Sequence, residues 1–530
     1  MYRRTAALVA VGAAVTGLVT GMPSAATAGG SAPRPAAGLI WRSCATEAFP
    51  RLECSEVQVP LDHARPNGRQ ITLALSRVRH TAKTFQGPLL VNPGGPGSSG
   101  LKMAGFVAAS LPAKVSAQYD VIGFDPRGVG SSRPALDCRP GHFAPVRADS
   151  VPHTPGGEIA NQVRAAAFAR GCAAKYADVL PHMSTVSAAR DLDLIRAALG
   201  AEKINYFGYS YGTYLGAVYA KYFPQRVRRA VFDSVVNPGG VWYRNNLDQD
   251  LGFDARHKAF TAWVARHNTT YRLGTDPAKV EAAWYAMREA LRKKPAGGKV
   301  GPTELEDTFL PGGYYNGFWP YLAEAFSAFA RGKDPKPLVE EYENFGAVDA
   351  AGDNSYSVYT AVQCRDAQWP RSWASWHADN WSTHAKAPFS TWNNAWYNAP
   401  CASWPVAPLT PTDVSNTALP PVLVFQATED AATPYEGGVA AHRKLRGSRL
   451  VVEQGGGNHA VTLGGNTCLD RYLTDYLATG KLPAPSATGA ADAVCAATPE
   501  PEPRKAAARA GRADAAQAGA LLHRMLGHRN

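Results

Sequence analysis

A serine flanked by glycines, between a strand and a helix, is the feature that most constrains the fold of this chain. The run Gly-Tyr-Ser-Tyr-Gly at residues 208–212 follows a short apolar segment, residues 204–207, and precedes a helical pattern, residues 213–222. A turn from a buried strand directly into a helix is so tight that only glycine leaves room on either side. The hydroxyl of Ser210 is therefore expected to stand clear of the sheet, beside backbone N–H groups of the helix N-terminus.

The sequence around this turn alternates between short apolar runs and helical periodicity. A helix is predicted at residues 187–199, where leucine and isoleucine recur at helical spacing. Strands are predicted at residues 71–78, 89–92, 119–124, 204–207 and 230–233. This alternation is typical of an α/β protein with a mainly parallel sheet covered by helices.

From residue 237 to residue 420 the alternation stops, and helical sequence rich in tryptophan takes over. Strands resume at residues 422–426 and 450–453. We therefore expect a core in two parts, residues 40–236 and 421–497, interrupted by a large, mostly helical inserted lid. The tryptophans are either a substrate funnel or ordinary packing, and packing is favoured for any one of them.

The two ends of the chain differ from the rest in composition. Arg3 and Arg4 precede an uncharged stretch that ends in Ala-Thr-Ala at residues 26–28. This order is typical of a secretory signal, so residues 1–28 are predicted to be removed and the protein to be secreted to the extracellular space. The Ala/Arg-rich residues 498–530 are predicted to be a mobile tail.

Eight cysteines in an exported chain indicate disulfides. Many connectivities are possible, and the simplest joins each cysteine to its neighbour along the chain. The predicted pairs are Cys44–Cys54, Cys138–Cys172, Cys364–Cys401 and Cys468–Cys495. A metal site is the rival interpretation, but there is no Cys-x-x-Cys and no His-Glu-x-x-His run, so no metal or other cofactor is expected.

Charge and hydropathy narrow the range of partners. The net charge is +12, but the basic residues form no dense stripe, so nucleic-acid binding is not expected. After the first thirty residues no apolar run is long enough to cross a bilayer, so stable membrane insertion is not expected either. The chain is predicted to be a monomer.

The setting of Ser210 is similar to the nucleophile elbow of the α/β-hydrolase fold. An aspartate at this position would indicate an epoxide hydrolase or a dehalogenase, whereas serine indicates acyl transfer through an acyl-enzyme. The structural alternative is a serine without a catalytic role in a glycine-rich turn. The strand before it and the helix after it favour the nucleophile.

A serine nucleophile needs a base, and in this fold the chain order is serine, then aspartate or glutamate, then histidine. His459 follows the last predicted strand in Gly-Gly-Gly-Asn-His, residues 455–459, and is the predicted base. Among the other histidines, His442 lies upstream on a predicted surface helix, and His523 and His528 lie in the tail.

The predicted acid is Asp430, in a turn just after the strand at residues 422–426. A carboxylate there would hold the histidine tautomer and stabilise imidazolium. Glu429 and Asp233, which ends the preceding predicted strand, stay open as alternatives. A carboxylate that merely caps the turn is the structural alternative.

The predicted oxyanion hole combines two backbone N–H groups. The run Asn-Pro-Gly-Gly-Pro-Gly at residues 92–97 follows a predicted strand, and its glycines would let the N–H of Gly95 approach a substrate carbonyl. Tyr211, the residue after the nucleophile, would supply the second N–H.

Four segments together resemble the secreted tripeptidyl aminopeptidases of actinomycetes, which are relatives of prolyl aminopeptidase. They are residues 92–97, Phe-Asp-Pro-Arg-Gly-Val-Gly-Ser-Ser at 124–132, the turn at 208–212, and Asp430 with Thr433-Pro434. The resemblance covers residues 40–497 and implies the same five site residues. It also implies removal of short peptides from free N-termini. One departure is Ala431-Ala432 after Asp430, where relatives often have a proline. The segment at 124–132 is expected to be a structural turn.

The sequence thus predicts a secreted serine aminopeptidase that acts on peptides with free N-termini and releases short peptides, by resemblance tripeptides. An esterase or amidase with the same triad is the alternative, because a fold does not fix a substrate. A binding protein with a degenerate hydrolase fold is the third hypothesis, and the three intact triad positions speak against it.

Overall fold

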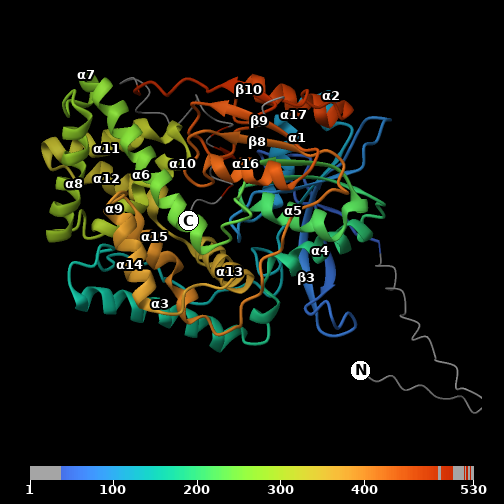
Figure 1. The fold of residues 1–530 in the computed structure, drawn as a ribbon, viewed down its shortest axis with the longest axis horizontal. Helices are drawn as coiled ribbons and strands as arrows, with labels where there is room; N and C mark the ends of the chain where they lie inside the picture. The colour runs from blue at the N-terminus through green and yellow to red at the C-terminus, as the bar shows by residue number, and fades with distance from the viewer. Residues whose placement is uncertain (1–37, 487–490, 505–518, 520, 523–525, 527–530) are drawn as a thin grey trace, which may run out of the picture. The chain divides into compact units, whose positions relative to one another are not determined.

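The described residues of the computed structural model, 38–486, 491–504, 519, 521–522 and 526, form a ten-stranded sheet with helices on both faces (Figure 1). The strands are β1 Arg42–Ser43, β2 Glu53–Pro60, β3 Gln70–Val78, β4 Pro88–Asn92, β5 Asp120–Phe124, β6 Ile204–Tyr209, β7 Val227–Asp233, β8 Leu423–Ala427, β9 Arg449–Gln454 and β10 Ala493–Ala496. Their order across the sheet is β1-β2-β3-β5-β4-β6-β7-β8-β9-β10. The pairings β1–β2, β2–β3 and β3–β5 are antiparallel, and the others are parallel. The mainly parallel α/β sheet predicted from the sequence is confirmed.

Successive strand residues point to opposite faces of the sheet, so each face has its own apolar core. Leu90 and Tyr206 belong to one cluster, whereas their neighbours Leu89 and Phe207 belong to the other. The first face is covered by α3 Pro155–Tyr176, α4 Thr185–Ala198, α5 Tyr211–Tyr222 and α16 Tyr435–Lys444. The second face is covered by α1 Leu101–Ser110, α2 Ala113–Ser116 and α17 Thr467–Thr479. Because both faces are covered, β4, β6 and β8 are buried along their whole length.

The chain leaves the sheet after β7 and returns at β8. The helices between them are α6 Tyr243–Arg266, α7 Asn268–Tyr271, α8 Pro277–Lys293, α9 Pro302–Phe309, α10 Pro311–Tyr314, α11 Trp319–Gly332, α12 Lys336–Glu341, α13 Ala350–Asp366, α14 Trp373–His384 and α15 Thr391–Asn398. We call residues 237–420 the insert. It has an apolar core of its own around Trp263, Trp284 and Trp319, and its helices lie beside the sheet in Figure 1.

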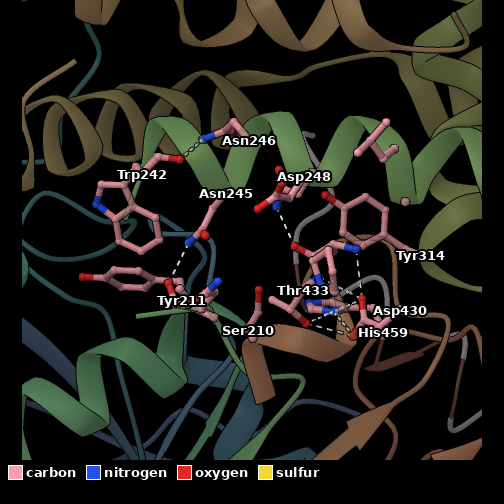
Figure 2. A pocket seen from close by; sticks show the side chains of 18 of the residues that line it. Ser210, Tyr211, Trp242, Asn245, Asn246, Asp248, Tyr314, Asp430, Thr433 and His459 are labelled. Atoms are coloured by element: carbon pink, nitrogen blue, oxygen red, sulfur yellow. Dashed lines mark hydrogen bonds and ion pairs between the residues drawn. The ribbon is translucent and has the colours of Figure 1, made fainter. Parts of the chain in front are cut away.

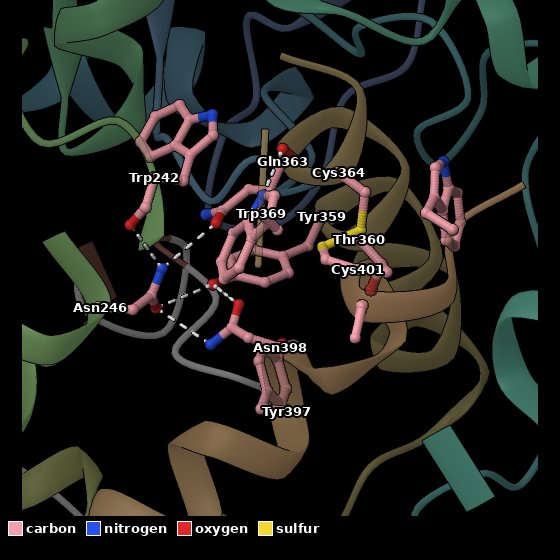
Figure 3. Close-up of a disulfide and its surroundings, with 12 residues drawn as sticks. Trp242, Asn246, Tyr359, Thr360, Gln363, Cys364, Trp369, Tyr397, Asn398 and Cys401 are labelled. Atoms are coloured by element: carbon pink, nitrogen blue, oxygen red, sulfur yellow. Dashed lines mark hydrogen bonds between the residues drawn. A yellow bond between two sulfur atoms is a disulfide. The ribbon is translucent and has the colours of Figure 1, made fainter. Parts of the chain in front are cut away.

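The eight cysteines form the four neighbour pairs that the sequence predicts: Cys44–Cys54, Cys138–Cys172, Cys364–Cys401 and Cys468–Cys495. Three of the bridges lie within the two parts of the core. The fourth, Cys364–Cys401, joins the end of α13 to the turn after α15 within the insert (Figure 3). None of the four bridges links the insert to the core, so the two regions are held together by packing, hydrogen bonds and ion pairs such as Arg288–Asp149.

Some described residues of the segment 498–530, predicted to be a mobile tail, contact the rest of the protein. Trp263 Nε1 donates to the carbonyl of Pro501 at 2.9 Å. Leu522 and Leu526 are buried in the same cluster as α1 and α17. The prediction rested on composition, because alanine and arginine dominate the segment; of its leucines, Leu522 and Leu526 are buried and Leu521 is exposed.

The remaining residues of that segment, including His523 and His528, lie outside the described residues, as does the predicted signal at 1–28. Within the part of the chain that the structure describes, no helix is both long and apolar enough to span a bilayer.

Candidate active site

Ser210 lies in the turn between β6 and α5, with a backbone conformation that L-residues rarely adopt. Its φ is 55° and its ψ is −129°. The glycines of the motif are required by close contacts: a Cβ on Gly208 would lie 2.5 Å from the carbonyl oxygen of Gly212, and one on Gly212 would lie 2.8 Å from Asn92 Oδ1. The backbone of the turn thus holds Ser210 in one position, at the N-terminus of α5.

His459 and Asp430 meet at the other side of the same cavity. His459 Nδ1 lies 2.8 Å from Asp430 Oδ2 and 3.0 Å from Oδ1, and both side chains are almost fully buried. Because Asp430 accepts the Nδ1 proton, Nε2 is the nitrogen left free to accept a proton from a serine. Asp430 and His459 are 29 residues apart in sequence. They meet because Asp430 follows β8, His459 follows β9, and these two strands are parallel neighbours in the sheet.

Asp430 is also held by its own turn. Its Oδ1 accepts hydrogen bonds from the backbone N–H groups of Ala432 and Thr433 at 2.9 and 3.0 Å, and its Oδ2 accepts one from the Thr433 hydroxyl at 2.9 Å. The turn-capping role and the contact with His459 therefore belong to the same carboxylate. The hydroxyl of Thr433 lies 3.3 Å from His459 Nδ1, so it contacts both partners.

The alternative acids have other partners. Asp233 is fully buried and accepts hydrogen bonds from the backbone N–H groups of Val461 and Thr462, so it holds the loop that follows His459. Burial raises the pKa of Asp233 to about 6. Glu429 forms an ion pair with Arg256 at 3.1 Å. Of the three carboxylates, Asp430 is the one whose oxygens lie within hydrogen-bond distance of His459.

The loop at residues 92–97 presses against the elbow. A Cβ on Gly94 would lie 2.8 Å from the Cβ of Ser210, and Gly94, Gly95 and Gly97 all have φ near +100°. Glycine is therefore required there both for space and for backbone conformation. The backbone of Gly95 and that of Tyr211 both line the cavity beside Ser210, where the sequence predicts the two oxyanion donors.

The segment at 124–132 is the structural turn that the sequence predicts. The guanidinium of Arg127 donates twice to Asp191, at 2.7 Å each, and both residues are buried. Asp125 accepts from the hydroxyl of Ser99 at 2.6 Å and from the backbone N–H of Ser131 at 2.8 Å. These contacts fix the turn after β5 to α4 and to the residues just after the loop at 92–97.

All five predicted site residues line one cavity of about 680 Å³, the size of a site for a small peptide (Figure 2). Ser210, Tyr211 and Gly95 come from the first part of the core, and Asp430 and His459 come from the second. Helix α6 of the insert passes over them in Figure 2 and contributes Trp242, at its N-cap, together with Asn245 and Asp248. Trp242 is thus a tryptophan that faces the cleft, whereas Trp263, Trp284 and Trp319 serve packing.

Sequence reasoning missed several residues that complete the site. The carbonyl of Tyr314 accepts from the backbone N–H of His459 at 2.8 Å, and the ring of Tyr314 packs edge-on against the imidazole. Arg256 and Leu526 also line the cavity. Spacing in the sequence offered no signal for them, because each comes from a segment distant from the residues it contacts.

The chain is similar to known proteins along most of its length. A family model described as the alpha/beta hydrolase fold matches residues 87–463. The tripeptidyl aminopeptidase of Streptomyces lividans is 45% identical over 480 residues, which cover 88% of either chain. Serine protease Hip1 of Mycobacterium tuberculosis is 34% identical over 455 residues, 81% of this chain and 86% of that one. Carboxylesterase B of the same organism is 34% identical over 517 residues, 91% of this chain and 98% of that one. The chain therefore belongs to the α/β-hydrolase family, and within it to the serine hydrolases of the exopeptidase group that includes tripeptidyl aminopeptidase.

Proposed function

We propose that the protein is an exported serine aminopeptidase that releases tripeptides from free N-termini, with Ser210 as nucleophile, His459 as base and Asp430 as its acid partner. The observation that carries the proposal is the meeting of these three side chains at one cavity beneath α6. The length of three residues is supported by the name of the Streptomyces relative. Export is supported by the four disulfides and by the signal-like residues 1–28.

The reaction would follow from the geometry in two halves. Ser210 Oγ attacks the scissile carbonyl while His459 Nε2 takes its proton, and Asp430 stabilises the imidazolium that forms. The backbone N–H groups of Gly95 and Tyr211 would donate to the oxyanion. His459 then gives the proton to the leaving amine, and a water molecule, activated by the same base, releases the tripeptide from Ser210.

Recognition of a free N-terminus needs negative charge at the acyl end of the cavity. Four carboxylates line the cavity, of which Asp430 is engaged by His459 and Glu429 by Arg256. Asp248, on α6, pairs with Arg244, whose side chain is 71% exposed, and such a pair is easily exchanged for a ligand. We infer that Asp248 binds the substrate ammonium and that the insert acts as the lid limiting the length of the acyl part.

The decisive experiment is hydrolysis of mono-, di- and tripeptidyl chromogenic amides, each with a free and with an acetylated amine. The proposal expects the free tripeptidyl amide to be cleaved fastest and acetylation to lower kcat/KM by about 10–100-fold, because a charge-assisted hydrogen bond is lost. Asp248→Asn should lower the preference for the free amine, and Glu436→Gln, in the first turn of α16 and also lining the cavity, is the matched comparison. Equal rates on free and acetylated substrates would refute the aminopeptidase.

An esterase or amidase is the second candidate, because carboxylesterase B is as similar to the chain as serine protease Hip1 is. Short acyl esters without any amine separate the two activities. An esterase would hydrolyse them at least as well as the tripeptidyl amide, whereas the proposed aminopeptidase would need the ammonium.

A further inference from the structure

Helix α6 of the insert places a buried arginine directly against the loop that carries His459. The side chain of Arg256 is only 7% exposed. A Cβ on Gly457 would lie 2.1 Å from Arg256 Cζ, so the guanidinium rests on the bare backbone two residues before His459. The ring of Trp319 lies on the guanidinium as well, with its centroid 5.0 Å from Cζ. Only glycine at position 457 leaves room for the guanidinium of Arg256.

The same guanidinium also reaches the turn that carries Asp430. Arg256 Nη1 donates to Glu429 Oε2 at 3.1 Å, and Glu429 directly precedes Asp430. The backbone N–H of Glu429 in turn donates to the carbonyl of Gly456 at 2.8 Å. Arg256 thus touches both loops of the acid–base pair, and it does so from the insert, 173 residues away from Glu429 in sequence.

A contribution to stability does not explain why an arginine is buried at position 256. Its Nε is buried and has no hydrogen-bond partner in the described part of the chain, and burial lowers the pKa of Arg256. A buried cation with unsatisfied donors costs free energy relative to an apolar residue of similar size. Its position at the edge of the cavity, beside the acid–base pair, points to a role in the reaction.

The charges that surround His459 come from several elements. Asp430 contacts the ring, and Glu429 lies beside it on the same turn. Asp233 holds the residues after His459 from the end of β7, and Glu453 lies on β9 near Asp430. Burial raises the pKa of Asp233 to about 6 and that of Glu453 to about 7. Against these carboxylates, Arg256 supplies positive charge from α6.

We propose that Arg256 is a positioning residue for the acid–base pair, which holds the loops of Asp430 and His459 together and so keeps the imidazole in place to accept the proton of Ser210. Its ion pair with Glu429 fixes the guanidinium between the two loops. The inference rests on the proposed roles of Ser210, Asp430 and His459. It adds that the insert takes part in the chemistry as well as in covering the cavity.

The test is the rate of Ser210 labelling by a fluorophosphonate, which needs the base but no peptide. Arg256→Met should lower that rate by about 10–100-fold, because a displaced base loses its alignment with the serine. Glu429→Gln should lower it less, since the guanidinium still rests on Gly457. Arg256→Lys, which keeps a donor for Glu429, should restore much of the wild-type rate. Arg266→Met, on the same helix and paired with Glu500, is the control and should leave the rate unchanged.

Rescue by Arg256→Lys, with equal melting temperatures among the variants, supports the proposal, because loss of a purely structural residue would lower stability and labelling together. An unchanged labelling rate in Arg256→Met, or a loss that only follows a loss of stability, would overturn it. Glu429 is half exposed, so Glu429→Gln remains a valid test even where Arg256→Met does not fold.

Arg256→Met and Glu429→Gln should also lower kcat/KM on a tripeptidyl amide, which has no C-terminal carboxylate, whereas the Arg266→Met control should not. A loss confined to substrates with a free C-terminal carboxylate would make Arg256 a substrate-binding residue and would also overturn the proposal. If Arg256→Met and Glu429→Gln slow the labelling but no peptide is cleaved, the aminopeptidase is wrong and the role of Arg256 stands.

Discussion

The core and the insert place their functional groups by different physical means. In the core, backbone contacts fix the site: Gly94, Gly208 and Gly212 each lie where any Cβ would come within 2.8 Å of a neighbouring atom. In the insert, side chains fix one another, as where Asn398 Nδ2 donates to Asn246 Oδ1 at 3.0 Å in a buried network beside the cavity (Figure 3). The geometry of the proposed active site therefore depends on backbone conformation, and the shape of the cavity above it depends on polar side-chain networks.

This difference teaches which part of the molecule is able to vary. A backbone turn that admits only glycine tolerates no other residue, so the reaction carried out by the core is expected to stay the same. A network of amides and ion pairs can be rebuilt from many combinations of residues, and such substitutions change the shape of the cavity without moving Ser210. Substrate selection is accordingly expected to reside in the insert, and the rate of acyl transfer in the core together with Arg256.

The largest expected effect is at the strained residue of the core. Ser210→Ala should lower kcat by about 10⁴–10⁶-fold and abolish fluorophosphonate labelling, because the nucleophile is gone. Ser210→Gly should be equally inactive but should raise the free energy of unfolding by about 1 kcal/mol, since glycine adopts φ 55° without strain. Activity assays and thermal melts check both. A stability gain with alanine as large as that with glycine would contradict the account of backbone strain.

The next largest effect is expected in the insert, where α8 carries a buried arginine. Arg288 donates to Glu306 at 2.7 Å and pairs with Asp149, and burial raises the pKa of Glu306 to about 7. Arg288→Met leaves these carboxylates without their cation and should cost about 3–5 kcal/mol of unfolding free energy. Arg292→Met, one turn along, removes an exposed pair and should cost less than about 1 kcal/mol. Chemical denaturation measures both, and equal losses would show that the insert does not depend on its buried charges.

The sequence predicted the fold where the signal was local. Strands β3, β4, β6 and β8 are recognisable as short apolar runs. The elbow is recognisable because its two glycines flank Ser210 between a strand and a helix, although Gly212 is required by Asn92 of a distant loop. The antiparallel strand β2 was not predicted, although its buried residues alternate along the strand. Alternation over so few residues is a weak signal, and a proline ends the strand.

For the candidate site, too, the sequence predicted only what local signals indicate. Ser210, Asp430 and His459 each follow a strand, and the order of strands in a parallel sheet brings their ends together. Arg256, Tyr314 and Leu526 were not predictable, because no periodicity links α6, α10 or the last segment of the chain to the loop of His459. What decides those contacts is how the insert packs on the core, and a single sequence does not encode that in local spacing.

The dependence of stability on pH separates the two regions further. Burial raises the pKa of Glu453, in the core, to about 7 and that of Asp366, in the insert, to about 6. Each folded carboxyl keeps a proton that the unfolded chain has already lost, so stability should fall as pH rises from about 4 to the folded pKa. Glu453→Gln should remove the fall in unfolding free energy that this carboxyl causes up to about pH 7. Asp366→Asn should remove the corresponding fall only up to about pH 6, and each fall is at most about 3 kcal/mol. Unfolding free energies measured from pH 4 to pH 8 check this, and a curve unchanged in both variants would contradict it.

The smallest expected difference concerns the disulfides. Cys364–Cys401 closes 37 residues of the insert, whereas Cys44–Cys54 closes only 10 residues of the core. If a bridge acts mainly by restricting the unfolded chain, the longer loop stabilises more, by about 1 kcal/mol. Replacing both cysteines of a pair by serine should therefore lower the melting temperature more for Cys364–Cys401. A larger loss at Cys44–Cys54 would mean that its bridge supports the folded edge of the sheet, where β1 pairs with β2.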